Sequence, residues 1–232
     1  MRGSSRGRSI AGRRVPAVVA ALALGVAAIA IGACGDDDDD DGGDVSLAEL
    51  KTHLPAPEDL GLKSDPEQSD VEADNANAFI VLGVNIPEST TAADVGTVLE
   101  DAGFQGGVGS TSHDSAKKLM VLMAAAQFDS EEGALEARDA LHAEDLKQPC
   151  EAACVVSPRE YEVQQIADAA AVHHVPNPGK PPPGLVKFEA YHAEFVIDSD
   201  LYIVQASFPP GWTSAAEFDD IVSTVYETAS GA

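Results

Sequence analysis

The spacing of apolar and polar positions along residues 45–232 predicts alternating strands and helices. Apolar runs of strand length, rich in β-branched and aliphatic residues, occur at five places. The predicted strands cover residues 78–86, 117–128, 170–175, 185–197 and 201–208. The last two runs flank Asp198, Ser199 and Asp200, which predicts a hairpin turn at that point.

Four other stretches repeat their apolar residues at the spacing of one helix face. A Ser or Thr precedes each stretch as a candidate N-cap, and a Glu three residues after the first and last caps completes a capping box. The predicted helices follow the caps Ser46, Thr91, Ser130 and Ser214. The apolar stripe of the last helix consists of Phe218, Ile221, Val222, Val225 and Ala229.

Strands joined by helices and one hairpin predict an α+β domain, with a mostly antiparallel sheet and helices packed on one face. Residues 55–77 are polar, so we expect irregular chain there. The glycine-rich residues 103–110 follow a helix and lead to a strand, which is the reverse of the order in a phosphate-binding loop. We interpret Gly103 as a helix C-cap and the remainder as a flexible turn.

Two segments of the chain align without a gap at an offset of 123 residues. Residues 79–99 and 202–222 are identical at 6 of 21 positions. One interpretation is a duplicated strand–helix unit, and the alternative is a similarity of composition alone. Duplication predicts that the two segments superpose.

The N-terminal residues have the layout of a secretory signal. Residues 1–14 are basic, and residues 15–33 are uncharged and rich in Ala, Val, Leu and Ile. Cys34 follows, and Asp36 to Asp41 form an acidic run directly after Gly35. The run is interpreted as a solvated spacer that repels itself into an extended form.

The sequence Ile31-Gly32-Ala33-Cys34 resembles the lipobox of bacterial lipoproteins, with Ile in place of the commoner Leu. The resemblance implies cleavage after Ala33 and a lipid on Cys34 that anchors the chain in the cell membrane. The alternative is an uncleaved transmembrane helix, since nineteen apolar residues can just span a bilayer. Both interpretations place the chain after Cys34 on the extracytoplasmic side. The implied parts are a signal peptide (1–33), a lipidated cysteine with an Asp/Gly spacer (34–44) and a single extracytoplasmic domain (45–232).

The charge balance narrows the choice of partners. Five arginines and no acidic residue precede Cys34, so the rest of the chain carries 9 basic residues against 39 acidic ones, a net charge of −30. A surface this negative repels phosphate backbones, which argues against nucleic acid as a partner. We expect a monomer that contacts the membrane only through the lipid on Cys34.

Cys150 and Cys154 are the two remaining cysteines. Thiols oxidise outside the membrane, and with Cys34 taken by lipid the remaining number is even. A four-residue separation on a helical turn is within the Cα–Cα range of a disulfide. The sequence therefore predicts a structural disulfide between them. A redox role would require the two-residue spacing of thioredoxin-like motifs.

The candidate ligand-binding residues are His173, His174, His192 and Trp212. His173 and His174 are adjacent on a predicted strand and point to opposite faces, so only one of them can join any given site. Zinc needs three or four convergent ligands, and acidic residues are too frequent here to single any out. We therefore predict half-exposed sheet histidines, with no metal and no cofactor, and interpret Trp212 as a packing anchor rather than a ligand-stacking residue.

The chain contains no Gly-x-Ser-x-Gly, His-Glu-x-x-His or Walker glycine motif, and no catalytic residue is predicted. The sequence predicts a non-enzymatic domain that binds a ligand or an envelope partner. Two alternatives stay open: an extracytoplasmic enzyme using one of the three histidines with a carboxylate, and a structural envelope protein. The chain resembles some actinobacterial lipoproteins and kinase sensor domains. The shared features are an Ala-rich acidic composition, one small disulfide, and strands that end in Phe and are followed by a helix. That resemblance assigns no functional residue.

Overall fold

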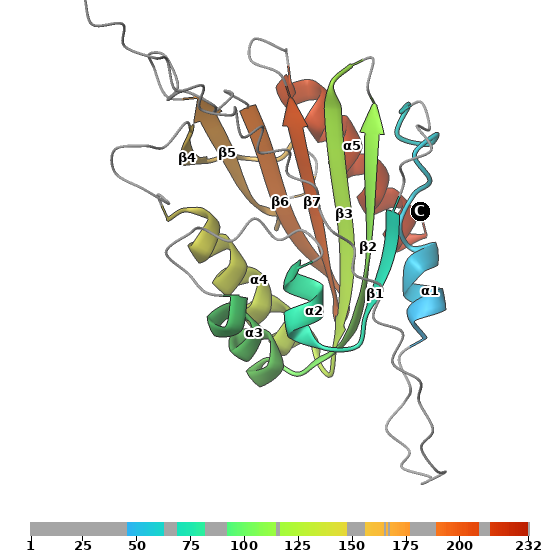
Figure 1. Ribbon diagram of the computed structural model, residues 1–232, viewed down its shortest axis with the longest axis vertical. Helices are drawn as coiled ribbons and strands as arrows, with labels where there is room; N and C mark the ends of the chain where they lie inside the picture. Colours follow the sequence, from blue (N-terminus) through green and yellow to red (C-terminus); the bar gives the residue numbers. More distant parts are fainter. Residues whose placement is uncertain are drawn as a thin grey trace, which may run out of the picture. The chain divides into compact units, whose positions relative to one another are not determined.

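The described part of the chain is an antiparallel sheet with helices packed against it (Figure 1). The computed structural model describes residues 46–62, 69–81, 92–114, 117–147, 156–164, 166, 168–176, 189–208 and 214–231. The helices are α1 (Leu47–Thr52), α2 (Ala76–Val81), α3 (Ala92–Asp101), α4 (Glu131–Asp145) and α5 (Ser214–Ser230). The strands are β1 (Ser69–Ala73), β2 (Phe104–Asp114), β3 (Leu119–Phe128), β4 (Val156–Glu160), β5 (Ala170–Pro176), β6 (Glu189–Ile197) and β7 (Asp200–Phe208). The predicted α+β class is confirmed.

The strand order is β1-β2-β3-β7-β6-β5-β4, and every neighbouring pair is antiparallel. Strands β6 and β7 form the predicted hairpin, whose turn consists of Asp198 and Ser199. Asp198 has a φ of 54°, a left-handed conformation that Asp tolerates better than most residues. In this strand order both β6 and β7 lie inside the sheet, each between two other strands.

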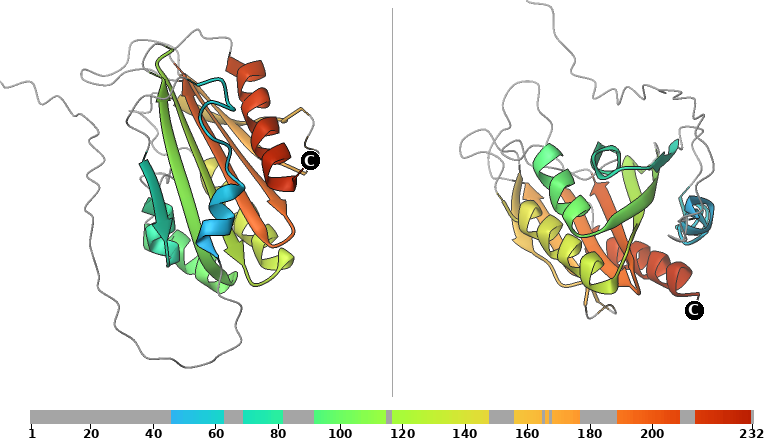
Figure 2. Two further views of the ribbon diagram at one scale, coloured as in Figure 1. Left: turned by 90° about the vertical axis from the view of Figure 1, so that its right-hand side faces the viewer. Right: turned by 90° about the horizontal axis from the view of Figure 1, so that it is seen from below.

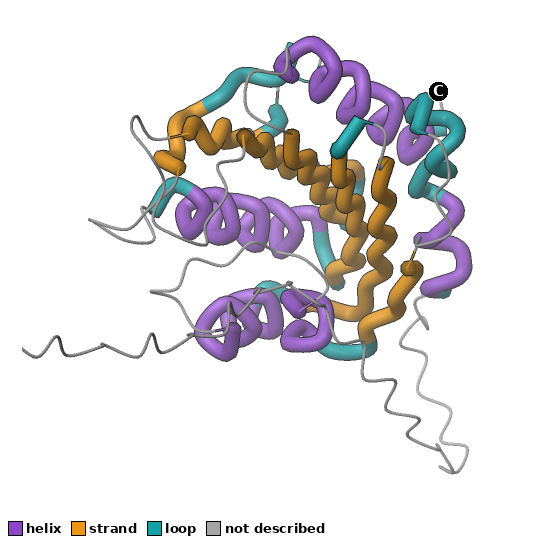
Figure 3. The backbone as a smooth tube through the Cα atoms, turned by 45° about the horizontal axis from the view of Figure 1, so that its top comes forward, coloured by secondary structure: helices purple, strands orange, loops and turns teal. Residues whose placement is uncertain are grey.

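Helices cover both faces of the sheet, which corrects the prediction of a single covered face (Figures 2 and 3). We call the side packed against α1 and α5 the α5 face, and the side packed against α2, α3 and α4 the α4 face. The central strand β3 explains the difference, because its residues 121–126 are buried on both sides. A strand that is apolar on both faces needs cover on both.

Each face has its own hydrophobic core. On the α5 face the predicted stripe of α5 packs on β6 and β7, and Leu50 of α1 joins it. On the α4 face Phe79, Leu99 and Leu141 bring α2, α3 and α4 together over β3 and β7. Among the described helices, none is both long and apolar enough to cross a membrane.

Three predicted helix signals are confirmed at atomic level. The Ser46 hydroxyl accepts a hydrogen bond from the Glu49 N–H (3.2 Å), and the Ser130 hydroxyl accepts one from the Gly133 N–H (3.2 Å). Gly103 follows α3 with a φ of 87°, as expected of a C-cap glycine. Local capping chemistry therefore sets these helix ends.

The predicted strand at residues 78–86 is wrong over the part that the structure describes, because residues 76–81 form helix α2. Asn75 starts this helix, since its Oδ1 accepts a hydrogen bond from the Ala78 N–H (2.9 Å). A short apolar run does not distinguish a buried helix from a buried strand. Residues 79–81 are thus helical where residues 202–204 are in strand β7, so the two aligned segments are not equivalent units.

Two further predictions were wrong in the first half of the domain. Residues 69–73, expected to be irregular, form β1, and residues 103–110, expected to turn, mostly form β2. The glycines of β2 permit close packing: a Cβ on Gly107 would lie 2.5 Å from Phe79 Cδ2. Glycine is depleted in strands, and here the tertiary contact with Phe79 overrides that preference.

Candidate functional site

The buried stripe of α4 ends in a polar residue. Ala134, Ala137 and Leu141 are buried at helical spacing, and Asp145 takes the next position of the same stripe. His142 lies three residues before Asp145, so the two side chains share one side of the last helical turn. The last turn of α4 thus directs His142 and Asp145 at the sheet, in a position where apolar side chains would extend the hydrophobic core.

The strand facing this turn also carries polar residues. Side chains alternate along β6, so His192 and Glu194 both point to the α4 face while Tyr191, Ala193 and Phe195 join the core of the α5 face. His192 is paired with Val172 of β5 on one side and Gln205 of β7 on the other. Because α4 covers this part of the sheet, the polar residues of β6 are buried.

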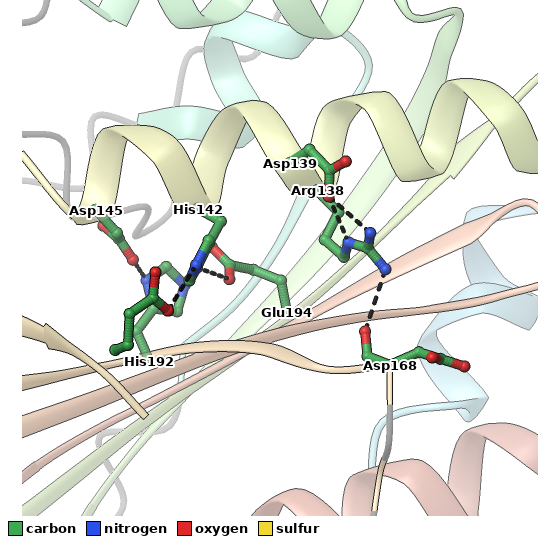
Figure 4. A network of polar contacts seen from close by, with 8 residues as sticks. Arg138, Asp139, His142, Asp145, Asp168, His192 and Glu194 are labelled. Carbon is green, nitrogen blue, oxygen red and sulfur yellow. Dashed lines mark hydrogen bonds and ion pairs between the residues drawn. The ribbon is translucent and has the colours of Figure 1, made fainter. Parts of the chain in front are cut away.

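We call His142, Asp145, His192 and Glu194 the inner cluster (Figure 4). The figure shows His142 and Asp145 reaching from α4 towards the strand that carries the other two. Asp145 Oδ2 contacts His192 Nδ1, and Glu194 lies between the two imidazoles. Its Oε2 is 3.7 Å from His142 Nδ1, and its Oε1 is 3.8 Å from His192 Nε2. Two imidazoles and two carboxyl groups therefore converge.

The inner cluster is closed to solvent on its sheet side. Glu194 is 0% exposed, His192 1% and Asp145 3%. Six of the cluster's buried atoms make no regular hydrogen bond within the described residues, although each lies within ion-pair distance of another cluster atom. These atoms are His142 Nδ1, Asp145 Oδ2, both ring nitrogens of His192 and both carboxyl oxygens of Glu194. Buried polar atoms without a hydrogen bond are rare in folded proteins and call for an explanation.

Burial lowers the pKa of both histidines and neighbouring carboxylates raise it, and the net result differs between the two. Burial lowers the pKa of His192, and it outweighs the opposing effect of Glu194. Glu194 beside His142 raises the pKa of that histidine, and Glu160 adds to the effect. His192 is thus held as the neutral imidazole, the form that binds metal ions.

Glu160 links the inner cluster to the surface. It lies at the end of the edge strand β4, and its Oε2 is 3.2 Å from His142 Nε2. The Glu160 side chain is 71% exposed and that of His142 is 19% exposed. Exposure therefore falls stepwise from Glu160 through His142 to Glu194.

The structure brings only His192 of the predicted candidates into the cluster. His174 points to the same face, while His173 points to the α5 face, where it stacks on Tyr191 (ring centroids 4.0 Å apart) and pairs with Glu189 (2.8 Å). The opposite directions of the adjacent histidines are confirmed. The prediction of half-exposed histidines is wrong for His174 and His192, because α4 covers them.

Four other predicted site residues lie outside the described residues: Cys34, Cys150, Cys154 and Trp212. The lipid anchor, the disulfide and the packing role of Trp212 stay predictions. Sequence reasoning missed His142, Asp145 and Glu194. One signal was available for Asp145, since it continues the buried spacing of α4.

Comparison with known proteins gives similarity of structure only. The chain is similar to the crystal structure of the extracellular domain of PknH from Mycobacterium tuberculosis, with a TM-score of 0.49 and 13% identity, covering 79% of this chain and 97% of that one. It is also similar to an uncharacterized protein of Mycobacterium smegmatis, the Rv0999 ortholog, with a TM-score of 0.37 and 13% identity, covering 79% and 94% of the two chains. No family model matches the chain, and no curated protein does.

Proposed function

We propose that the chain is a lipid-anchored extracytoplasmic protein whose domain binds an inorganic cation at the inner cluster without catalysing a reaction. The observation that carries the proposal is the burial of Asp145, His192 and Glu194, which are at most 3% exposed. A catalytic acid or base must reach its substrate. Groups this closed are out of reach of an organic molecule, so a small ion is the ligand that we propose for them.

Charge supports a cation as the ligand. From Cys34 onward the chain carries 39 acidic residues against 9 basic ones, so its field concentrates cations and repels anions. Two carboxyl groups of the inner cluster have oxygens without hydrogen-bond partners within the described residues. A bound cation would give these oxygens a partner.

The anchor is tested by Cys34→Ser. We expect the wild-type chain to incorporate labelled lipid and to run as a shortened mature form, because the lipobox thiol is the acceptor. The variant should stay as an unprocessed precursor without label, which gel mobility and labelling measure. Normal maturation of Cys34→Ser would contradict the anchor and leave the ion site unaffected.

Cation binding is tested by thermal unfolding of the full-length protein purified in detergent. After treatment with a chelator, the protein is expected to unfold at a lower temperature, and one class of added cation should restore the original value, since a ligand that binds only the folded state stabilises it. The panel contains sodium, magnesium, calcium, manganese and zinc. A melting temperature that no cation changes would overturn the proposal.

A further inference from the structure

The atoms of the inner cluster are spaced for one small ion. In a tetrahedral zinc site, nitrogen and oxygen ligands lie about 2.0–2.2 Å from the metal, and therefore about 3.3–3.6 Å from one another. The separations of the Glu194 oxygens from His142 Nδ1 and His192 Nε2 are 3.7 and 3.8 Å. Both exceed that range and involve different oxygens, Oε2 towards His142 and Oε1 towards His192, so the side chains must shift for one ion to reach both imidazoles.

Asp145 forms a group of three with His192 and Glu194, and its Oδ2 contacts the Nδ1 atom of His192 while Glu194 lies nearer Nε2. One ligand atom each of Asp145, His192 and Glu194 can be chosen so that all lie within 4.8 Å of one another. The spacing His142-x-x-Asp145 puts two ligands on one side of a helical turn, and His192-x-Glu194 puts two on one face of a strand. Two rigid elements therefore supply two ligands each.

The unpartnered atoms are an independent indication of a ligand. A buried donor or acceptor that lacks a hydrogen bond costs about 1–3 kcal/mol, and within the described residues these six atoms meet only one another, as carboxyl–imidazole contacts without hydrogen-bond geometry. An ion bound among them would engage one atom of each side chain at once. Apolar residues would fill the same space at lower cost if the cluster had no ligand.

We infer that the inner cluster binds one divalent first-row transition-metal ion of the zinc type through Asp145, His192 and Glu194, and that a shift of the His142 side chain supplies the fourth ligand, an inference that rests on the proposed cation-binding function. Two imidazole nitrogens and two carboxyl oxygens match a tetrahedral zinc site in number, and both are ligand types that zinc accepts. Calcium takes six to eight oxygen ligands, and magnesium keeps several of its waters. A buried, half-nitrogen ligand set suits neither of them.

Glu160 is the positioning residue of this site. When the Nε2–H of His142 donates to Glu160, the Nδ1 atom presents its lone pair to the inner cluster, 3.7 Å from Glu194. Carboxylates that hold the second nitrogen of a metal-binding histidine typically contribute 10–100-fold to metal affinity. Because Glu160 is exposed on an edge strand, its replacement leaves the core intact.

The experiment measures zinc content and affinity of the full-length protein in detergent after dialysis against zinc. We expect one zinc per chain in the wild type and none in the double variant His192→Gln with Glu194→Gln. Glu160→Gln should keep the stoichiometry and weaken the affinity about 10–100-fold. The matched control is His173→Gln on the opposite face of the same sheet, which should bind as the wild type does.

Cobalt substitution separates the inner cluster from the cysteines. We expect a tetrahedral cobalt spectrum without thiolate charge transfer, and unchanged zinc binding in Cys150→Ser with Cys154→Ser. Zinc retained by the double variant, or an affinity unaffected by Glu160→Gln, would overturn the inference. If calcium, magnesium or sodium alone binds, the inference fails and the proposed function stands. If no cation binds, both fail.

Discussion

Exchanging the buried polar groups of the inner cluster for apolar side chains is expected to stabilise the metal-free domain by about 1–4 kcal/mol. The exchange is Asp145→Val, His192→Leu and Glu194→Met in one chain. Burial of these three groups removes them from water, and their mutual contacts leave six buried atoms of the cluster without hydrogen bonds within the described residues. The free-energy cost of removing these polar groups from water then exceeds the stabilisation that their contacts provide.

A single exchange is expected to have the opposite sign. His192→Leu alone leaves Asp145 and Glu194 facing an apolar side chain, and an uncompensated buried charge costs about 3–5 kcal/mol. Urea unfolding in the presence of a chelator measures both variants. The matched control is His173→Leu with Glu189→Met on the α5 face, where the pair is half-buried and its loss should cost no more than about 1 kcal/mol.

In the presence of zinc the wild type should become more stable than the triple variant. At about a thousand times the dissociation constant, a bound ligand stabilises the folded state by about 4 kcal/mol, so the wild type gains this amount and the triple variant gains nothing. If the triple variant is less stable than the wild type in chelator, the polar groups stabilise the fold by themselves. The metal would then not be the reason for their burial.

One feature of β6 explains both the mistaken face prediction and the missed site. Along this strand Tyr191, Ala193 and Phe195 alternate with Ala190, His192 and Glu194. Such alternation ordinarily indicates one buried and one solvated face, in line with the prediction that His192 is half-exposed. Only the position of α4, which tertiary packing decides, buries them.

The elements that the sequence predicted correctly carry local signals. The capped helices α1, α3, α4 and α5, the hairpin of β6 and β7, and the apolar strand β3 follow from periodicity and turn residues within one segment. Strand β2 could not be predicted in this way, because its Gly106 and Gly107 make room for Leu47 and Phe79, which lie far away in the sequence. The candidate site has the same character: its four residues come from two elements some fifty residues apart, and no local pattern joins them.

Acidification is expected to lower the free energy of unfolding by about 3 kcal/mol through protonation of His174 alone. Burial lowers the pKa of His174 from 6.5 to about 4, with a smaller contribution in the same direction from His173 and an opposing one from Glu194. Only 6% of this residue is exposed, and its Nε2 has no hydrogen-bond partner within the described residues. Protonated His174 is therefore far less stable in the folded chain than in the unfolded one.

The sign of this pH dependence follows from the difference in proton binding between the folded and the unfolded chain. Between about pH 6.5 and pH 4 the unfolded chain protonates His174 and the folded chain does not, so the free energy of unfolding falls as the pH falls. The pKa difference of about 2.5 corresponds to about 3 kcal/mol. Above pH 6.5 the contribution is fully present, and below about pH 4 it is lost.

His174→Leu removes this titration, so we expect the free energy that the domain loses between about pH 7 and pH 4 to be smaller by about 3 kcal/mol than in the wild type. Urea unfolding at several pH values measures the difference. The matched control is His113→Leu on β2, an exposed position, which should keep the acid loss of the wild type. An equal acid loss in wild type and His174→Leu would mean that His174 takes up its proton without unfolding. The space between α4 and β5 would then have to admit water, and the burial that closes the inner cluster against organic ligands would be incomplete.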